Sequence, residues 1–232
     1  MKMAVVLPTY NEADNIAGLI ERLLAVKPPL TILVMDDQSP DGTAAVAEQL
    51  NRDGRVMVVR REPPRGRGYA GRDGFLRALA LGADCVLEMD ADGSHDPQYI
   101  PALLAALAEA DVAVGSRYCP GGRVVGYGLT RKLNSATANF LSRLILGVAQ
   151  RDATAGFRLF RRRVLEAIDL PTLISPGPSI VEEILYRVQQ HGFTVREIPI
   201  TFVNRVKGDT KIRLTTIVVW IATLLRVRFG RT

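Results

Sequence analysis

The 232-residue chain has few cysteines and no long uncharged apolar run. It contains two cysteines, Cys85 and Cys119, and no Cys-x-x-Cys pair, which argues against a disulfide framework and fits a reducing compartment. Its longest uncharged run near the C-terminus, residues 214–225, is well short of the roughly 20 residues that cross a bilayer. The N-terminal apolar stretch is also too short for a signal peptide. We therefore expect no transmembrane helix.

Acidic residues are outnumbered by basic ones. The chain has 30 Lys and Arg residues against 24 Asp and Glu residues, for a net charge of +6. Such an excess favours an anionic partner, whether a nucleotide, a phosphate, a nucleic acid or an anionic membrane. The basic residues are dispersed and lack interleaved aromatic residues, which disfavours nucleic-acid binding. With 47% hydrophobic residues, the chain is long enough for one α/β domain with a good-sized core.

Short apolar segments alternate with helical segments through the first half of the chain. Strands are expected at residues 4–7, 31–35, 55–59, 85–89 and 112–115. Helices are expected at residues 13–26, 41–51, 69–81 and 97–110. Because this alternation needs crossover connections, we predict a mostly parallel sheet flanked by helices. In the second half we expect helices at residues 131–147, 164–168, 180–190 and 215–229, and a strand at residues 194–202.

Polar segments directly follow four of the expected strands. They are Pro8-Thr9-Tyr10-Asn11-Glu12, residues 36–43, Asp90-Ala91-Asp92-Gly93-Ser94-His95 and Ser116-Arg117-Tyr118. Any one of them could be an ordinary turn, since Asp, Asn, Ser, Pro and Gly are common turn residues. The carboxyl ends of parallel strands meet at one sheet edge, where α/β proteins bind their ligands. Four such segments together therefore predict a binding site at that edge.

The pair Asp90 and Asp92 has a definite chemical use. Two carboxylates two residues apart in a loop can converge on one Mg²⁺ or Mn²⁺ ion, and diphosphate oxygens can complete its coordination shell. The cation would stabilise the negative charge that develops on a nucleoside diphosphate leaving group. Because Asp-x-Asp is by itself a weak signal, it indicates this chemistry only together with the other segments.

Taken in order, the four segments resemble the inverting family 2 glycosyltransferases with the GT-A fold. Within that family they are most similar to the dolichyl- or polyprenyl-phosphate mannosyltransferases. Further matches include Asp152-x-Thr154-x-Gly156-Phe157-Arg158 and Phe202-x-x-Arg205, so that the resemblance extends from Val5 to about Lys211. It implies a Rossmann-like GT-A catalytic domain over residues 1–212, followed by a C-terminal apolar and basic helix over residues 213–232.

The resemblance also implies roles for individual residues. The nucleotide-sugar would contact Pro8, Tyr10, Glu12, Met35, Asp37, Asp90, Ala91, Asp92, Arg205 and Lys211. The metal, Mg²⁺ or Mn²⁺, would be held by Asp90, Asp92 and Ser94, and the acceptor phosphate by Arg117, Arg131 and Ser135. Asp90, Asp92 and Arg117 would thus carry catalysis.

The implied activity is transfer of mannose from GDP-mannose to a polyprenyl or dolichyl phosphate. A phosphate monoester is already anionic at neutral pH, so the reaction needs no catalytic base and is expected to proceed by one displacement with inversion. We therefore expect a structural role for His95. Three alternatives stay open: a different sugar carried by UDP, a polysaccharide or small-molecule acceptor, and a nucleotide- or nucleic-acid-binding module without catalysis.

Three stretches stand apart from this pattern. Relatives commonly have Phe-Gln where this chain has Ile180-Val181, and residues 175–179 ahead of them are also unusual. These departures bear on the choice of mannose and on any role for Glu183, for which an ordinary helix carboxylate is an equal alternative. The arginine-rich residues 60–68 are expected to form a solvated loop that contributes only positive potential.

A lipid acceptor implies contact with a membrane. The apolar helices expected at residues 131–147 and 215–229 could lie in the membrane interface, with their arginines toward lipid phosphates, or pack on the sheet. Trp220 suits an interfacial position in the second helix. We therefore expect peripheral association with the cytoplasmic face of a membrane, either directly or through a membrane-spanning partner subunit.

Overall fold

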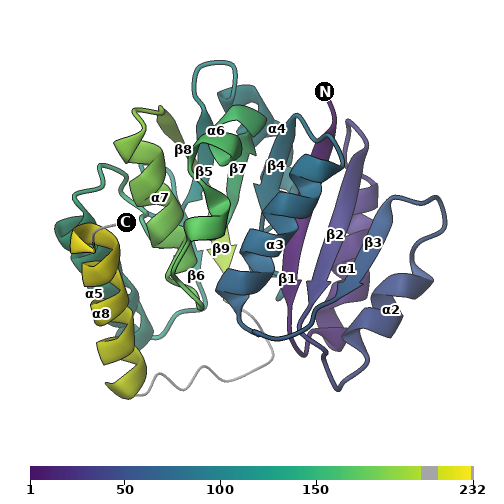
Figure 1. Ribbon diagram of the computed structural model, residues 1–232, viewed down its shortest axis with the longest axis horizontal. Helices are drawn as coiled ribbons and strands as arrows, with labels where there is room; N and C mark the ends of the chain where they lie inside the picture. The colour runs from purple at the N-terminus through teal and green to yellow at the C-terminus, as the bar shows by residue number, and fades with distance from the viewer. Residues whose placement is uncertain (205–213, 231–232) are drawn as a thin grey trace.

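A seven-stranded sheet forms the centre of the computed structural model, which describes residues 1–204 and 214–230 (Figure 1). Its strands are β1 (Met3–Thr9), β2 (Leu30–Asp36), β3 (Val56–Arg60), β4 (Cys85–Glu88), β5 (Val112–Ser116), β7 (Arg158–Arg161) and β8 (Val195–Pro199). Their order across the sheet is β3-β2-β1-β4-β7-β5-β8, and all run parallel except β7. The predicted mostly parallel sheet is confirmed.

Both faces of the sheet are covered by helices, which explains why the central strands are apolar throughout. Along β1, Met3, Val5 and Leu7 pack into one core cluster, whereas Ala4 and Val6 pack into another on the opposite face. This alternation follows from the two-residue period of a strand. A strand buried on both sides has no solvated face, so its sequence shows a continuous apolar run.

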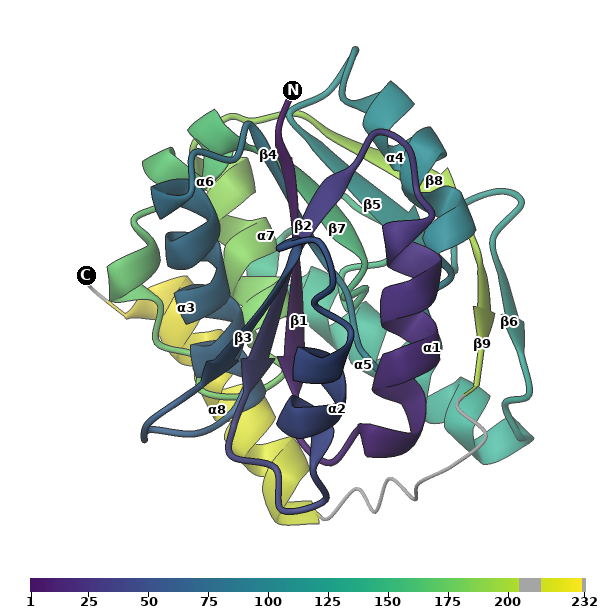
Figure 2. The same cartoon turned by 90° about the vertical axis from the view of Figure 1, so that its right-hand side faces the viewer.

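The helices form two layers (Figures 1 and 2). One face carries α1 (Ala13–Leu24), α2 (Thr43–Gln49) and α4 (Ile100–Ala106), and the other carries α3 (Arg67–Ala80), α6 (Arg162–Ala167) and α7 (Ile180–Gln190). Short 3₁₀ turns, η1 (Pro97–Tyr99) and η2 (Leu170–Thr172), precede α4 and α7. These layers give the sheet the α/β sandwich expected from the sequence.

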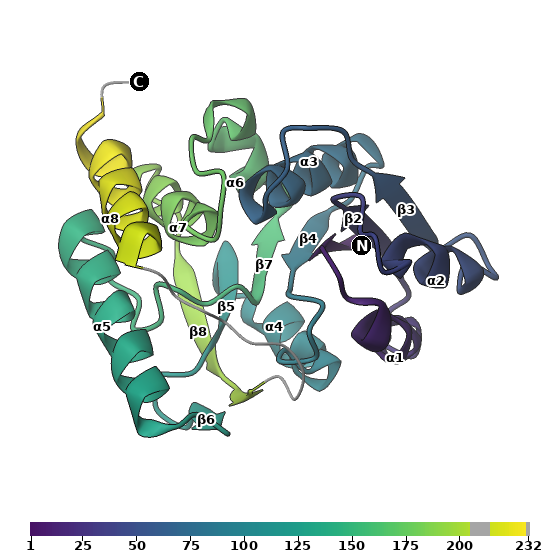
Figure 3. The same cartoon turned by 90° about the horizontal axis from the view of Figure 1, so that it is seen from below.

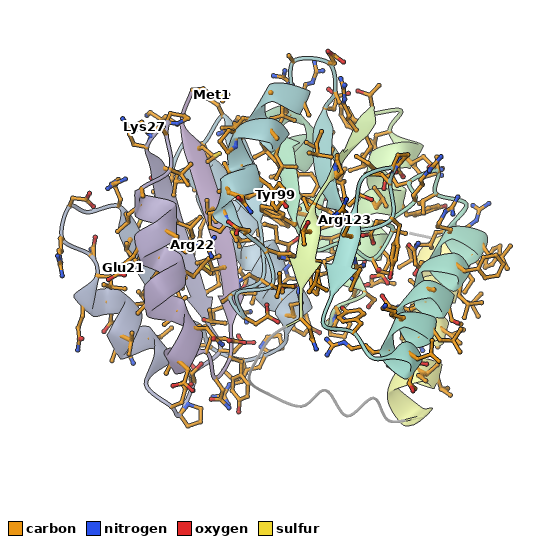
Figure 4. The ribbon with its side chains drawn as sticks, turned by 180° about the vertical axis from the view of Figure 1, so that it is seen from behind. Met1, Glu21, Arg22, Lys27, Tyr99 and Arg123 are labelled. Atoms are coloured by element: carbon orange, nitrogen blue, oxygen red, sulfur yellow. The ribbon has the colours of Figure 1, made fainter. Side chains whose placement is uncertain are left out.

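A second, two-stranded sheet joins β6 (Arg123–Val125) to β9 (Thr201–Val203). The Tyr99 hydroxyl, seen from behind in Figure 4, accepts a hydrogen bond from the Thr201 amide at 3.0 Å and ties η1 to β9. The single strand predicted at residues 194–202 is therefore two strands, β8 and β9, which belong to different sheets. Neither β6 nor β7 was predicted, because each is short and carries charged residues.

Two helices, α5 (Leu129–Leu146) and α8 (Leu214–Phe229), lie side by side next to α7, away from the centre of the sheet (Figure 3). They enclose a small third core cluster that includes Leu146, Leu185 and Leu224. The Trp220 indole donates a hydrogen bond to Glu182 Oε1 on α7 at 3.1 Å. Trp220 therefore faces the protein, and the interfacial position suggested by the sequence is corrected.

Close packing of α3 on β1 depends on Gly74, where an added Cβ would come within 2.3 Å of Val6 Cγ1. Gly18 on α1 is the matched control, because a Cβ there would meet nothing within 4 Å. We expect G74A to lower the free energy of unfolding by about 1–3 kcal/mol through overpacking. G18A should raise it by up to about 1 kcal/mol, because alanine favours the helix. Urea denaturation measures both, and equal stability of the two variants would contradict this packing.

Candidate functional site

A cavity of 340 Å³ lies at the carboxyl edge of the sheet. It is lined by the loops after β1, β2 and β4, the start of α3 and the segment before α7, through Pro8, Thr9, Tyr10, Glu12, Asp37, Arg67, Ala70, Asp90, Ala91, Asp92 and Pro178. The lining residues include most of those predicted to bind the nucleotide-sugar. The side chain of Met35 is buried in the core beneath α3, so the contact expected from its backbone stays a prediction. Arg205 and Lys211 lie outside the described residues.

The carboxylate of Asp37 is held by its own neighbours. Its Oδ1 pairs with the Arg61 guanidinium, and its Oδ2 accepts the Gly66 amide at 2.7 Å. Arg61 is 4% exposed and also pairs with Asp73 at 2.7 Å. The expectation of a solvated loop over residues 60–68 is therefore wrong for Arg61. Its partners lie directly after β2 and on α3, so their proximity depends on the fold.

Arg67 is the second arginine of that loop that turns inward. It donates to Asp90 Oδ1 from Nε at 3.2 Å and from Nη2 at 2.9 Å, and its Nη1 donates to Glu88 Oε1 at 3.1 Å. Burial raises the pKa of Asp90, but the surrounding basic groups, Arg67 foremost, together outweigh burial and bring that pKa to about 2. Asp90 is therefore ionised at neutral pH, as a metal ligand must be.

Asp92 and His95 complete the loop after β4. Asp92 Oδ1 accepts hydrogen bonds from the Ser94 hydroxyl at 2.6 Å and the Ser94 amide at 3.1 Å. His95 is buried and stacks on Phe157, and its Nδ1 accepts the Asp90 amide at 3.0 Å. Burial lowers the pKa of His95, so the neutral ring keeps this acceptor nitrogen. These contacts support the structural role expected for His95.

The cavity suits a hard divalent cation. Asp90 and Asp92 present carboxylate oxygens to one space, and such oxygens are the ligands that Mg²⁺ and Mn²⁺ prefer. Within residues 1–204 and 214–230, no three His, Cys, Asp or Glu side chains gather into a metal site. A cation held here would therefore need oxygens from a ligand or from water. Ser94 contacts Asp92, and direct ligation by Ser94 stays a prediction.

Arg117 is anchored beside this cavity by residues that precede β7. Its Nε and Nη2 donate to the two oxygens of Asp152 at 2.8 and 2.7 Å, and Nη2 also donates to Thr154 Oγ1 at 2.6 Å. Asp152 is fully buried. Burial lowers the pKa of Arg117, but the hydrogen bond and charge of Asp152, together with Tyr118 and Tyr127, outweigh burial and leave that pKa raised. Arg117 is therefore a fixed positive charge.

Three aromatic rings link the residues predicted to bind the acceptor phosphate. Tyr118 lies 5.2 Å from the Arg117 guanidinium, and its hydroxyl shares a hydrogen bond with the Ser135 hydroxyl at 2.7 Å. Arg131 stacks on Tyr127 at 4.5 Å. The structure thus brings Arg117, Arg131 and Ser135 into one cluster.

Phe202 connects this cluster to the loop after β4. Its ring lies 5.4 Å from the Arg117 guanidinium, 5.9 Å from Tyr127 and 5.6 Å from His95. The sequence motifs contained Tyr118 and Phe202 but gave neither of them a role. Tyr127 belongs to no motif, so nothing in the sequence singled it out.

Comparison with known proteins decides the family. The chain matches glycosyl transferase family 2 over residues 4–169. The protein belongs to this family. The alternative of a binding module without catalysis is thereby set aside.

Two curated relatives match this glycosyltransferase over most of its length. Polyprenol monophosphomannose synthase from Mycolicibacterium smegmatis is 45% identical over 210 residues, which cover 89% of this chain and 79% of the relative. Undecaprenyl-phosphate mannosyltransferase from Micrococcus luteus is 39% identical over 212 residues, which cover 91% of this chain and 87% of the relative. The resemblance described from the sequence is confirmed.

Solved structures confirm the GT-A fold. Mannosyl-3-phosphoglycerate synthase from Rubrobacter xylanophilus aligns with a TM-score of 0.70 at 23% identity, over 98% of this chain and 72% of the other. Glucosyl-3-phosphoglycerate synthase from Mycobacterium tuberculosis, in complex with Mn²⁺, UDP-glucose and phosphoglyceric acid, aligns with a TM-score of 0.70 at 19% identity. That alignment covers 100% of this chain and 81% of the other.

The unusual segment at residues 175–179 borders the cavity of the glycosyltransferase through Pro178. Glu183 fixes the start of this segment, because its carboxylate accepts the amides of Ile174 and Ser175 at 3.1 and 2.9 Å. It also pairs with Arg187 at 2.8 Å. These contacts support a structural role for Glu183.

Breaking the pair between Asp152 and Arg117 should destabilise the protein strongly. We expect D152N to lower the free energy of unfolding by about 3–5 kcal/mol, because it leaves a buried guanidinium without its counter-charge. E166Q, which breaks the exposed pair of Arg162 with Glu166, should cost less than about 0.5 kcal/mol. Urea denaturation of both variants is the measurement, and a small effect of D152N would show that the anchor is dispensable.

Proposed function

We propose that this glycosyltransferase transfers mannose from GDP-mannose to a polyprenyl or dolichyl phosphate, with Mg²⁺ or Mn²⁺ as cofactor. One observation carries the proposal: a 340 Å³ cavity lined by Asp37, Asp90 and Asp92 adjoins a cluster that contains Arg117 and Arg131. The two are connected by contacts from Asp90 through His95 and Phe202 to Arg117. Two relatives that span most of the chain are named for mannose transfer to such lipids.

The residues of the site fall into two groups, one that would bind the donor and its metal and one that would bind the acceptor. Asp90 and Asp92 would hold the cation, which supplies Lewis-acid stabilisation of the leaving diphosphate. Arg117 and Arg131 would bind the acceptor phosphate, since guanidinium groups donate paired hydrogen bonds to phosphate oxygens. Asp152 would keep the Arg117 guanidinium in place, so that no reorganisation is needed when the phosphate enters.

The acceptor oxygen arrives already ionised, so the site has no need of a general base. His95 is poorly placed to be one, because its Nδ1 accepts the Asp90 amide and its ring is buried between Phe157 and Phe202. Attack of the phosphate oxygen on the anomeric carbon would expel the nucleoside diphosphate in one displacement. The product would therefore have inverted stereochemistry.

A UDP-sugar is the second donor to consider. Both oxygens of Asp37 already accept hydrogen bonds from Arg61 and Gly66, and Asp37 is only 5% exposed. Guanine recognition by Asp37 would have to use the lone pairs that remain on these two oxygens. The choice between GDP and UDP is therefore a direct test of the role given to Asp37.

The decisive assay incubates the protein with Mn²⁺, a polyprenyl phosphate and either GDP-mannose or UDP-glucose, and detects the glycolipid by mass spectrometry. We expect mannolipid from GDP-mannose and none after chelation of the metal. D92N should lower the rate by at least about a hundredfold, because it removes charge that would hold the cation. Product from UDP-glucose alone would overturn the donor assignment, and a retained anomeric configuration would overturn the mechanism.

A lipid acceptor also requires a surface that meets the membrane, and we propose the outer face of α5 and α8. Its exposed apolar side chains are Leu129, Leu133, Phe140, Leu144, Ile217, Val218, Val219, Leu225 and Phe229. Arg131 and Ser135 lie on the same helix as the first four. None of the helices within the described ranges has the length and hydropathy needed to cross a bilayer. We propose that the contact is peripheral, at the cytoplasmic face.

Acidic substitutions on this face should abolish membrane binding without unfolding the protein, because the affected side chains are already exposed. Leu133 and Leu144 are each 66% exposed, so the L133D/L144D variant loses little packing. We expect wild type to float with vesicles that contain anionic lipid and the double variant to stay in the soluble fraction. L81D, at an exposed leucine beyond α3, is the control. Failure of wild type to float would favour a membrane-spanning partner subunit.

A further inference from the structure

Arg67 is the one arginine that lines the donor cavity among the residues that the structure describes. Its side chain is 20% exposed, while Nε and Nη2 both donate to Asp90 Oδ1 and Nη1 donates to Glu88. A guanidinium therefore occupies one oxygen of a carboxylate to which the proposed function gives the metal. The roles drawn from the sequence left this residue out.

The backbone around Arg67 leaves room for this pairing and for little else. A Cβ on Gly156 would lie 2.9 Å from Arg67 Nη2 and 3.3 Å from Asp90 Oδ2, and one on Gly71 would lie 2.9 Å from Glu88 Oε1. A Cβ on Gly68 would lie 2.0 Å from the Ser175 carbonyl oxygen, so the start of α3 packs closely on this backbone. Gly71 and Gly156 thus allow the backbone to approach the paired guanidinium and carboxylates closely.

Glu88 supplies the anchor for the guanidinium. It is fully buried on β4, and its Oε2 has no hydrogen-bond partner among the described residues. The Glu88–Arg67 contact therefore provides the direct counter-charge for this carboxylate. With its far side bound to Glu88, Arg67 is kept at the cavity wall.

A fixed guanidinium in this position affects two ligands in opposite ways. It competes for Asp90 with a divalent cation and repels that cation. It attracts a nucleoside diphosphate and can donate hydrogen bonds to its oxygens. We propose that Arg67 couples the two ligands: it weakens binding of the metal alone and strengthens binding of the metal together with a nucleoside diphosphate. This inference rests on the proposed function and assigns Arg67 as a ligand-binding residue within it.

Binding measurements test the coupling without turnover. Mn²⁺ binding to the whole protein is followed by electron paramagnetic resonance, alone and with saturating GDP or UDP. In wild type, the nucleotide should tighten Mn²⁺ binding, and by linkage Mn²⁺ should tighten nucleotide binding equally. R67M should bind Mn²⁺ alone about tenfold more tightly and lose about tenfold of the coupling, because one repulsive charge is gone. R67K should restore part of the coupling.

R72M is the matched control, because Arg72 lies on the same helix, pairs with Asp73 and does not line the cavity. It should match wild type in both measurements. R67M removes the hydrogen-bonded counter-charge of the buried Glu88, so R67M/E88Q is made as well and should show the same loss of coupling if R67M folds poorly.

The outcomes distinguish failure of the role given to Arg67 from failure of the proposed function. Unchanged Mn²⁺ affinity and unchanged coupling in R67M and R67M/E88Q would overturn the role of Arg67 alone. An equal weakening of metal and nucleotide binding would show a merely structural residue and would also overturn it. If wild type binds neither GDP nor UDP in the presence of Mn²⁺, the proposed function fails and this inference fails with it.

Discussion

The site depends on the reversal of one strand. β7 runs antiparallel between β4 and β5, with Arg158 opposite Glu88 on one side and Val114 on the other. The amino end of β7 therefore lies at the carboxyl ends of its neighbours, and the residues before it enter the ligand edge of the sheet. From there Asp152 anchors Arg117, and Phe157 stacks on His95. A parallel strand at this place would have put these residues at the opposite edge.

Charge in the site is organised by pairing. Arg61 with Asp37, Arg67 with Asp90 and Glu88, and Arg117 with Asp152 each join an arginine to a carboxylate from a distant segment of the chain. Because the partners are buried or partly buried, these contacts fix the positions of the groups more firmly than exposed pairs do. The site is thus preorganised for ligands that carry charge, and the net charge of +6 by itself gives no indication of this arrangement.

The helix α5 joins the cluster proposed to bind the acceptor phosphate to the surface proposed for the membrane. Its buried residues include Asn139 and Ser142, which bind the Ala153 amide and Glu182, whereas Leu133 and Leu144 point outward. This orientation reverses the usual arrangement for a surface helix of a soluble domain. The reversal is consistent with a lipid whose phosphate sits near Arg131 and Ser135 and whose chain follows the leucines into a bilayer.

The sequence alone determined the order of strands and helices up to β5, because their periodicity is local, and it identified the acidic cavity residues through motifs that follow strand ends. It did not reveal β7, since four residues with arginines at both ends look like a polar turn. It also placed Arg61 and Arg67 in solvent, because their carboxylate partners lie elsewhere in the chain. Which arginine is buried and which carboxylate it meets were decided only by the tertiary structure, since ion pairs between distant segments have no local signal in the sequence.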